Sequence, residues 1–76
     1  MKGPDPLTVF GDAVRQARQR LGVSQEEMAA ILGMHRTQLG HIEQGRKDCR
    51  LSTVMRLADA LQLPLSSLLK PLDQLT

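Results

Sequence analysis

Three polar side chains between residues 36 and 41 have the types and the spacing needed to read the edges of base pairs. If residues 36–43 form a helix, Arg36, Thr37 and His41 fall within an arc of about 140°, because each residue turns the helix by about 100°. A guanidinium, a hydroxyl and an imidazole on one helix face supply donors and acceptors that can meet base edges in a DNA major groove. Periodicity alone also leaves open an ordinary solvated helix face.

The opposite side of this helix is suited to anchoring it. Leu39 and Ile42 lie at about 240° to 340° from Arg36, with Glu43 at the border of the same arc. Met34, at the entry to the helix, adds a further apolar contact. We therefore predict a two-sided helix, with one flank held by a core and the other free.

Another short helix is predicted just before residues 36–43 in the sequence. Ser24 and Glu27 are spaced as a capping box, in which the hydroxyl and the carboxylate each accept a hydrogen bond from an orphan backbone N–H. Gly33 can adopt the left-handed conformation that a sharp reversal between helices needs. The inward stripe that we expect on this helix is Met28, Ala29, Ile31 and Leu32. Residues 24–45 thus predict a helix, a tight turn and a second helix.

The remaining helices follow from the same reasoning. A first helix begins at Asp5 or at Thr8, both of which are good caps, and ends at Gly22. Its expected buried stripe is Phe10, Val14, Ala17 and Leu21. A fourth helix, about residues 51–61, is expected to bury Val54, Met55, Ala58 and Leu61.

Prolines bound the last predicted helix. Pro64 can open it, and we expect it to run to about Lys70 and to be stopped by Pro71. No segment has the alternating period of a strand, so the fold class is all-α, a compact five-helix bundle. The 76 residues have room for one domain. We place that domain at residues 6–72, between a flexible N-terminal tail, 1–5, and a C-terminal tail, 73–76.

Composition restricts the function only weakly. Ten Lys and Arg against eight Asp and Glu give a net charge of +2, which permits a nucleic-acid partner without indicating one. The single Cys49 excludes an intramolecular disulfide and fits a reducing cytoplasm. The first residues, MKGPDP, do not read as a signal peptide, and no apolar run reaches the length of a membrane span. We expect a cytoplasmic protein, associated with the nucleoid when bound to DNA.

The succession SQEEMA, then a glycine, then HRTQLGHIEQG resembles the helix-turn-helix of phage repressor and Cro-like (XRE-type) regulators. The resemblance covers about residues 10–69 and implies a bundle of the phage-repressor DNA-binding type with a central helix-turn-helix. The chain is also similar to the small controller proteins of restriction–modification systems, which have about this length. His35 departs from the family pattern, in which Ser or Thr is common at that helix entry.

The resemblance assigns roles to residues outside the reading face. It implies that Gln25, in the first turn of its helix, bonds a DNA phosphate, as a helix N-terminus favours. It also implies that the basic residues after the second helix of the motif hold the DNA backbone; these are Arg46, Lys47 and Arg50. Finally, it implies a largely buried ion pair between Arg18 and Glu43.

Gly40 is unusual within a helix, where glycine costs about 1 kcal/mol relative to alanine. Close approach of the DNA backbone or close approach of a neighbouring helix would each explain it. We favour the DNA and include Gly40 among the phosphate contacts.

A single domain of this size makes few DNA contacts, so we expect a symmetric homodimer. Its half-sites, in a pseudo-palindromic operator, would lie about 34–36 Å apart. The C-terminal region has more leucine than the core readily absorbs, and the candidates for the dimer contact are Leu65, Leu68, Leu69 and Leu72. Purely intramolecular packing of these leucines is the alternative.

We predict a sequence-specific, duplex-DNA-binding transcriptional regulator that acts as a dimer and places residues 36–43 in the major groove. The alternative is a helical protein-interaction module, such as an antitoxin-like partner binder, without DNA readout. We predict no enzyme activity, cofactor, metal or small-molecule ligand, because the chain has no catalytic or metal motif. His35 and His41 lie about 120° apart on their helix, which does not suit a shared metal site.

Overall fold

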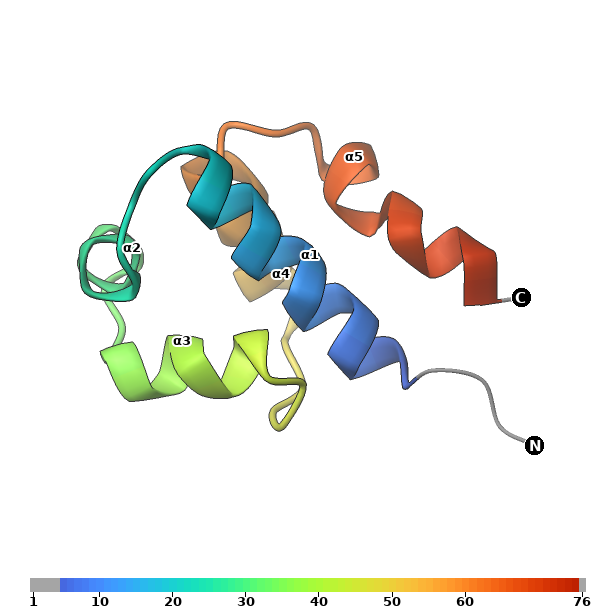
Figure 1. The fold of residues 1–76 in the computed structure, drawn as a ribbon, viewed down its shortest axis with the longest axis horizontal. Helices are drawn as coiled ribbons and strands as arrows, with labels where there is room; N and C mark the ends of the chain where they lie inside the picture. Colours follow the sequence, from blue (N-terminus) through green and yellow to red (C-terminus); the bar gives the residue numbers. More distant parts are fainter. Residues whose placement is uncertain (1–4, 76) are drawn as a thin grey trace.

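The computed structural model describes residues 5–75. Within them the chain forms five α-helices and a final 3₁₀ helix (Figure 1), in the order α1 (Pro6–Arg20), α2 (Gln25–Leu32), α3 (Arg36–Glu43), α4 (Leu51–Ala60), α5 (Leu65–Leu69) and η1 (Lys70–Leu75). Helix α1 runs through the middle of the molecule and packs against α3, α5 and η1, whereas α2 contacts α3 and α4. The all-α five-helix architecture is as predicted.

Helix α1 begins at the earlier of its two possible starts. Asp5 is the residue before the helix, and Pro6 occupies the first helical position, where its missing N–H costs nothing. Three of the four predicted stripe residues, Phe10, Val14 and Ala17, are buried. Leu21 is 38% exposed, contrary to prediction, because α1 ends at Arg20 and the next residue lies past the packed length of the helix.

Helices α1 and α3 lie unusually close together at Gly11. A Cβ atom added there would lie 2.3 Å from the carbonyl oxygen of Ile42 and 2.6 Å from that of Glu43. These are backbone atoms, so they cannot move aside as a side chain can. Gly11 therefore sets how near the α3 helix is held to the centre of the bundle.

Left-handed glycines close both helices of the central motif, and the one at Gly33 is as predicted. Gly33 has a φ of 67°, and the N–H of Met34 beyond it donates to the carbonyl of Ala29 at 3.0 Å. Gly45 has a φ of 74°, and the N–H of Arg46 donates to the carbonyl of His41 at 2.9 Å. In each case the bond satisfies an orphan carbonyl of the last turn and turns the chain sharply.

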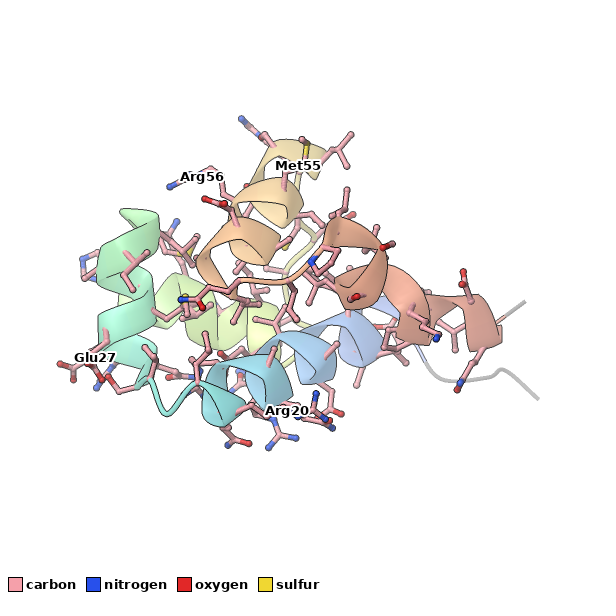
Figure 2. The ribbon with its side chains drawn as sticks, turned by 90° about the horizontal axis from the view of Figure 1, so that it is seen from above. Arg20, Glu27, Met55 and Arg56 are labelled. Carbon is pink, nitrogen blue, oxygen red and sulfur yellow. The ribbon has the colours of Figure 1, made fainter. Side chains whose placement is uncertain are left out.

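The inward phase of α4 differs from the prediction. Its buried residues are Leu57, Ala58 and the adjoining Leu61, whereas Met55 is 54% exposed and points away from the bundle (Figure 2). Residues 54, 57, 58 and 61 form the spacing of one helix stripe, and position 55 lies about 100° away from position 54. Helix α4 therefore buries Leu57, which we did not predict to be in the core, and exposes Met55, which we did.

Helix α2 shows a similar difference. Met28, Ala29 and Leu32 are buried as predicted, but Ile31 is 63% exposed. Neighbouring helices α3 and α4 cover α2 along one stripe, and Ile31 lies outside it.

The C-terminal segment stays helical for longer than predicted. Helix α5 ends at Leu69, ahead of Pro71 as predicted, but the chain then continues as the 3₁₀ helix η1 to Leu75. Pro71 is tolerated because it lies in the first turn of that helix, where its N–H is not needed. Residues 73–75, assigned to a tail, thus belong to a helical turn. Of the remaining tail assignments, residues 1–4 and 76 lie outside the described residues.

Candidate nucleic-acid interface

Helix α3 has the two-sided character expected of a recognition helix. Leu39 is 0% exposed and Ile42 is 6% exposed, so this flank is sealed against the core. Arg36 and Thr37 are exposed, and His41, one turn further on, is half-buried. The helix lies along one edge of the molecule, below α1 in Figure 1. Its polar flank is thus turned outward at an edge that a second molecule can approach.

The start of α3 is held by Gln38 instead of His35. The backbone N–H of His35 donates to Oε1 of Gln38 at 3.0 Å, which is one half of a capping box. The His35 side chain, among the residues described, makes no cap hydrogen bond of its own. The helix start is therefore fixed from inside α3, and the His35 imidazole is left exposed beside Arg36.

Arg36 is engaged by an acidic residue of the preceding helix. Its Nη1 donates to Oε1 of Glu26 at 2.8 Å, in an ion pair that joins the first turn of α2 to the first turn of α3. Both side chains remain open to solvent, with 62% of Arg36 and 72% of Glu26 exposed. The pair thus orients the guanidinium without removing it from the surface.

Gln25 of α2 contacts α3 beside the recognition face. Its Nε2 donates to Oε1 of Glu43 at 3.0 Å, and its amide atoms lie 3.8 Å from the position that a Cβ of Gly40 would occupy. That distance is ordinary van der Waals contact, so the neighbouring helix does not require a glycine at position 40. Of the two explanations for Gly40, close helix packing is therefore wrong, and close approach of DNA stays a prediction.

The buried ion pair implied by the resemblance is present. Arg18 donates from Nε to Oε2 of Glu43 at 2.7 Å and from Nη2 to Oε1 at 3.0 Å. Its Nη1 donates to the carbonyl of Val23 at 2.9 Å, so the guanidinium also fixes the turn before α2. The hydrogen bonds to Glu43 raise the pKa of Arg18 above its ordinary value, against the opposing effect of burial.

This network connects the core to the interface. Glu43 accepts hydrogen bonds from α1 through Arg18 and from α2 through Gln25, while its own backbone belongs to α3. One buried carboxylate thereby fixes the relative positions of the three helices around the recognition face. Buried charges are stable only when they are paired in this way.

Basic side chains border α3 at its carboxyl end. Arg46, Lys47 and Arg50 are all exposed in the segment between α3 and α4. Asp48 accepts a hydrogen bond from the backbone N–H of Cys49 at 2.8 Å, which shapes this loop. The Cys49 thiol is partly buried, and that burial, followed by the charge of Asp48, raises its pKa above the ordinary value.

The leucines considered for a dimer contact are not equivalent. Leu68 is 2% exposed and belongs to the hydrophobic core, so it is not available to a partner, and its assignment to the dimer contact is corrected. The other three leucines are partly buried and pack against that core from its edge; they are Leu65, Leu69 and Leu72. Intramolecular packing, the alternative to a dimer contact, thus fully accounts for Leu68.

The described part of the chain offers neither a cluster of metal ligands nor a helix that could span a membrane. No group of three or more His, Cys, Asp or Glu side chains that could hold a metal ion occurs in residues 5–75. Over the same residues, no helix combines the length and the apolar character needed to span a bilayer.

Two of the polar contacts that were not foreseen from the sequence hold opposite ends of α2. One is the Glu26–Arg36 pair, and the other is a hydrogen bond from Nη2 of Arg56 to the carbonyl oxygen of Leu32. Arg56 lies on α4 (Figure 2) and caps the carboxyl end of α2, whose orphan carbonyls attract a cation. The partners of these two contacts lie 10 and 24 positions apart and on different helices, so no local sequence pattern identifies them as partners.

Comparisons with known proteins agree with this geometry. Residues 9–69 match the protein family described as a helix-turn-helix domain. The chain is 38% identical over 65 residues to the control protein C.SmaI of Serratia marcescens, covering 86% of this chain and 77% of that protein. It is 35% identical over 54 residues to the control protein C.BamHI of Bacillus amyloliquefaciens, covering 70% of this chain and 67% of that protein.

A solved structure extends the similarity to three dimensions. The restriction-modification controller protein C.AhdI from Aeromonas hydrophila superposes with a TM-score of 0.78 and 34% sequence identity. The match covers 82% of this chain and 94% of that one.

Proposed function

This chain belongs to the helix-turn-helix domain family, and on that premise we propose that it is a sequence-specific transcriptional regulator of duplex DNA. It acts by binding and not by catalysis. Helix α3 enters the major groove, where Arg36 and Thr37 contact base edges and His41 contacts a base or a phosphate one turn later.

The observation that carries this proposal is the division of α3 into two flanks. Leu39 and Ile42 are buried, so the helix cannot rotate about its axis to present another face. The outward flank therefore always offers the same side chains, with Arg36 and Thr37 exposed. A rigid helix with a fixed polar face at an edge of the molecule is what base reading in a groove requires.

Phosphate contacts surround the reading face. One contact comes from Gln25 in the first turn of α2. The others come from the basic segment after α3, which supplies Arg46, Lys47 and Arg50. Gly40, whose lack of a side chain nothing in the bundle requires, allows the DNA backbone to approach α3 closely. These contacts supply affinity and register, whereas the α3 side chains supply specificity.

The regulator acts as a symmetric dimer on a pseudo-palindromic operator, because one small reading face makes too few contacts for tight specific binding. With Leu68 in the core, the candidate contact consists of Leu65, Leu69 and Leu72 at the C-terminal edge. Sedimentation equilibrium measures the stoichiometry directly, and a monomer at all concentrations with and without operator would contradict the dimer.

Selection of binding sites from a random duplex pool tests the function as a whole. We expect an enriched, two-fold symmetric site with half-sites about one helical turn apart. Affinity for that site should fall steeply with salt. The slope of log affinity against log salt concentration should be near −0.9 for each phosphate contacted. A chain that enriches no sequence, and that binds duplex no better than any mildly basic protein, would instead fit the protein-interaction alternative.

A further inference from the structure

We propose that Glu26 is a specificity-determining residue of the DNA interface, which acts by positioning the guanidinium of Arg36 before DNA is bound. This inference rests on the proposed function, because it assigns a role within the reading face of α3. It concerns a residue that sequence patterns place merely in the first turn of α2, beside the capping box of Ser24 and Glu27.

The ion pair fixes a side chain that would otherwise be mobile. Arginine has several rotatable bonds, and an exposed arginine at a helix start loses considerable freedom when it meets a base. Nη1 of Arg36 is held at 2.8 Å from Oε1 of Glu26, and Glu26 is carried by a different helix. Since α2 and α3 are fixed to one core, the contact gives the guanidinium a defined place relative to both helices.

The atoms involved leave the reading edge free. Glu26 receives its hydrogen bond from Nη1, and within the part of the chain that the structure describes the Arg36 guanidinium makes no other hydrogen bond or ion pair. The edge formed by Nε and Nη2 therefore remains available, and this edge can donate two parallel hydrogen bonds to O6 and N7 of a guanine. A carboxylate on Nη1 thus orients the fork and does not block it.

Access to this edge is open. The pair borders a surface hollow of about 300 Å³ between α2 and the start of α3, lined also by Ala29, Ala30 and Met34. With 62% of its side chain exposed, Arg36 is not covered by the bundle.

The negative charge of Glu26 also favours specific over non-specific binding. The first turn of α2 is where the proposed function places a phosphate, through Gln25. A carboxylate next to that position repels the DNA backbone of any sequence, which lowers non-specific affinity. Only a site that offers a guanine to Arg36 recovers the loss. Glu26 therefore widens the ratio between specific and non-specific binding, which is the quantity that matters for site selection in a genome.

Glu26→Gln tests the inference in the full chain, with Asp59→Asn on α4 as a matched control. Both substitutions remove one negative charge from an exposed position, but only the first touches Arg36. Fluorescence anisotropy is measured at fixed salt with three duplexes. These are the selected site, the same site altered at the base pair whose preference Arg36→Ala abolishes, and a random sequence.

We expect Glu26→Gln to lower discrimination between the first two duplexes by about 1.5-fold to fivefold, the range of an exposed ion pair. Its affinity for random duplex should rise by about twofold, whereas Asp59→Asn should leave both quantities within error. In the Arg36→Ala background, Glu26→Gln should leave the ratio of affinities for the selected and the random duplex unchanged, because its effect on specificity passes through that arginine.

The outcomes separate this inference from the proposed function. If the wild-type chain selects no site, the proposed function fails and the inference falls with it. If the wild type discriminates and Glu26→Gln discriminates equally well, the inference alone is overturned. A fall in the ratio of selected to random affinity that Glu26→Gln still causes in the Arg36→Ala background would also overturn it, since Glu26 would then act through another route.

Discussion

Arg18 and Glu43, 25 positions apart in the sequence, meet in a two-bonded ion pair with donor–acceptor distances of 2.7 and 3.0 Å. Only 11% of the Arg18 side chain and 2% of the Glu43 side chain are exposed. The pair lies directly behind the recognition helix, and Glu43 also accepts the amide of Gln25. Stability of the bundle and placement of the interface therefore depend on the same carboxylate.

Replacing Glu43 by alanine is expected to destabilise the domain by about 3–5 kcal/mol, because the Arg18 charge is left desolvated without its partner. Urea unfolding followed by circular dichroism measures the change. The control is Asp12→Ala, which breaks an exposed ion pair with Arg15 and should cost about 1 kcal/mol or less. Equal unfolding midpoints for Glu43→Ala and the wild type would contradict the structural role of the pair.

Gly11→Ala should separate α1 from α3. The added methyl would lie 2.3 Å from the carbonyl oxygen of Ile42, and because that atom is backbone, relief requires movement of a whole helix. We expect a loss of about 1–3 kcal/mol, typical of overpacking, in a thermal or urea unfolding experiment. Since alanine favours helix over glycine, a variant as stable as the wild type would show that the two helices are not in such close contact.

Gly40→Ala should separate stability from binding. The nearest atoms to an added Cβ, those of the Gln25 amide, are 3.8 Å away, so the bundle accommodates the methyl. Its higher helix propensity should stabilise the domain by up to about 1 kcal/mol. Titration of the selected duplex should nevertheless show weaker binding, because the methyl lies where the DNA backbone approaches. Unchanged affinity in a more stable variant would remove Gly40 from the interface.

The capping box of α2 should make stability depend on pH in the acid range. Hydrogen bonds from the backbone N–H and the side chain of Ser24 lower the pKa of Glu27 below its ordinary value of 4.5. A carboxyl whose pKa is depressed in the folded state stabilises that state above the unfolded value, and the contribution is lost as pH falls through the folded value. The stability difference between wild type and Glu27→Gln, measured by urea unfolding, should therefore be constant near neutral pH and shrink below about pH 4.5. A difference that does not change with pH would indicate that the charge of Glu27 plays no part.

Neutralising the basic segment after α3 should weaken binding to all sequences alike. Arg46→Gln, Lys47→Gln and Arg50→Gln should each reduce the slope of log affinity against log salt by about 0.9, one phosphate contact each. Arg20→Gln, on α1 (Figure 2), is the control and should leave the slope unchanged. A variant that loses preference for one base pair but keeps its salt slope would place that residue among the base contacts instead.

The helical organisation was readable from short-range chemistry. Three features depend only on residues within about one or two helical turns of each other: capping by Ser24 and Glu27, the left-handed turn at Gly33 and the apolar stripe of α1. Such local patterns can be recognised from the sequence alone. The two flanks of α3 followed for the same reason, because position around a helix depends only on spacing. Where the phase was ambiguous, as with Met55 and Leu57 on α4, the prediction chose the wrong side.

The sequence by itself thus determined which segments are helices, where they turn and which face of α3 carries polar groups, since these depend on neighbours along the chain. Only the tertiary structure decided that Leu68 belongs to the core, that Gly11 meets the backbone of α3 and that Glu26 holds Arg36. The physical reason is that burial and ion pairing depend on which surfaces distant helices bring together. Local spacing leaves the relative placement of those helices open.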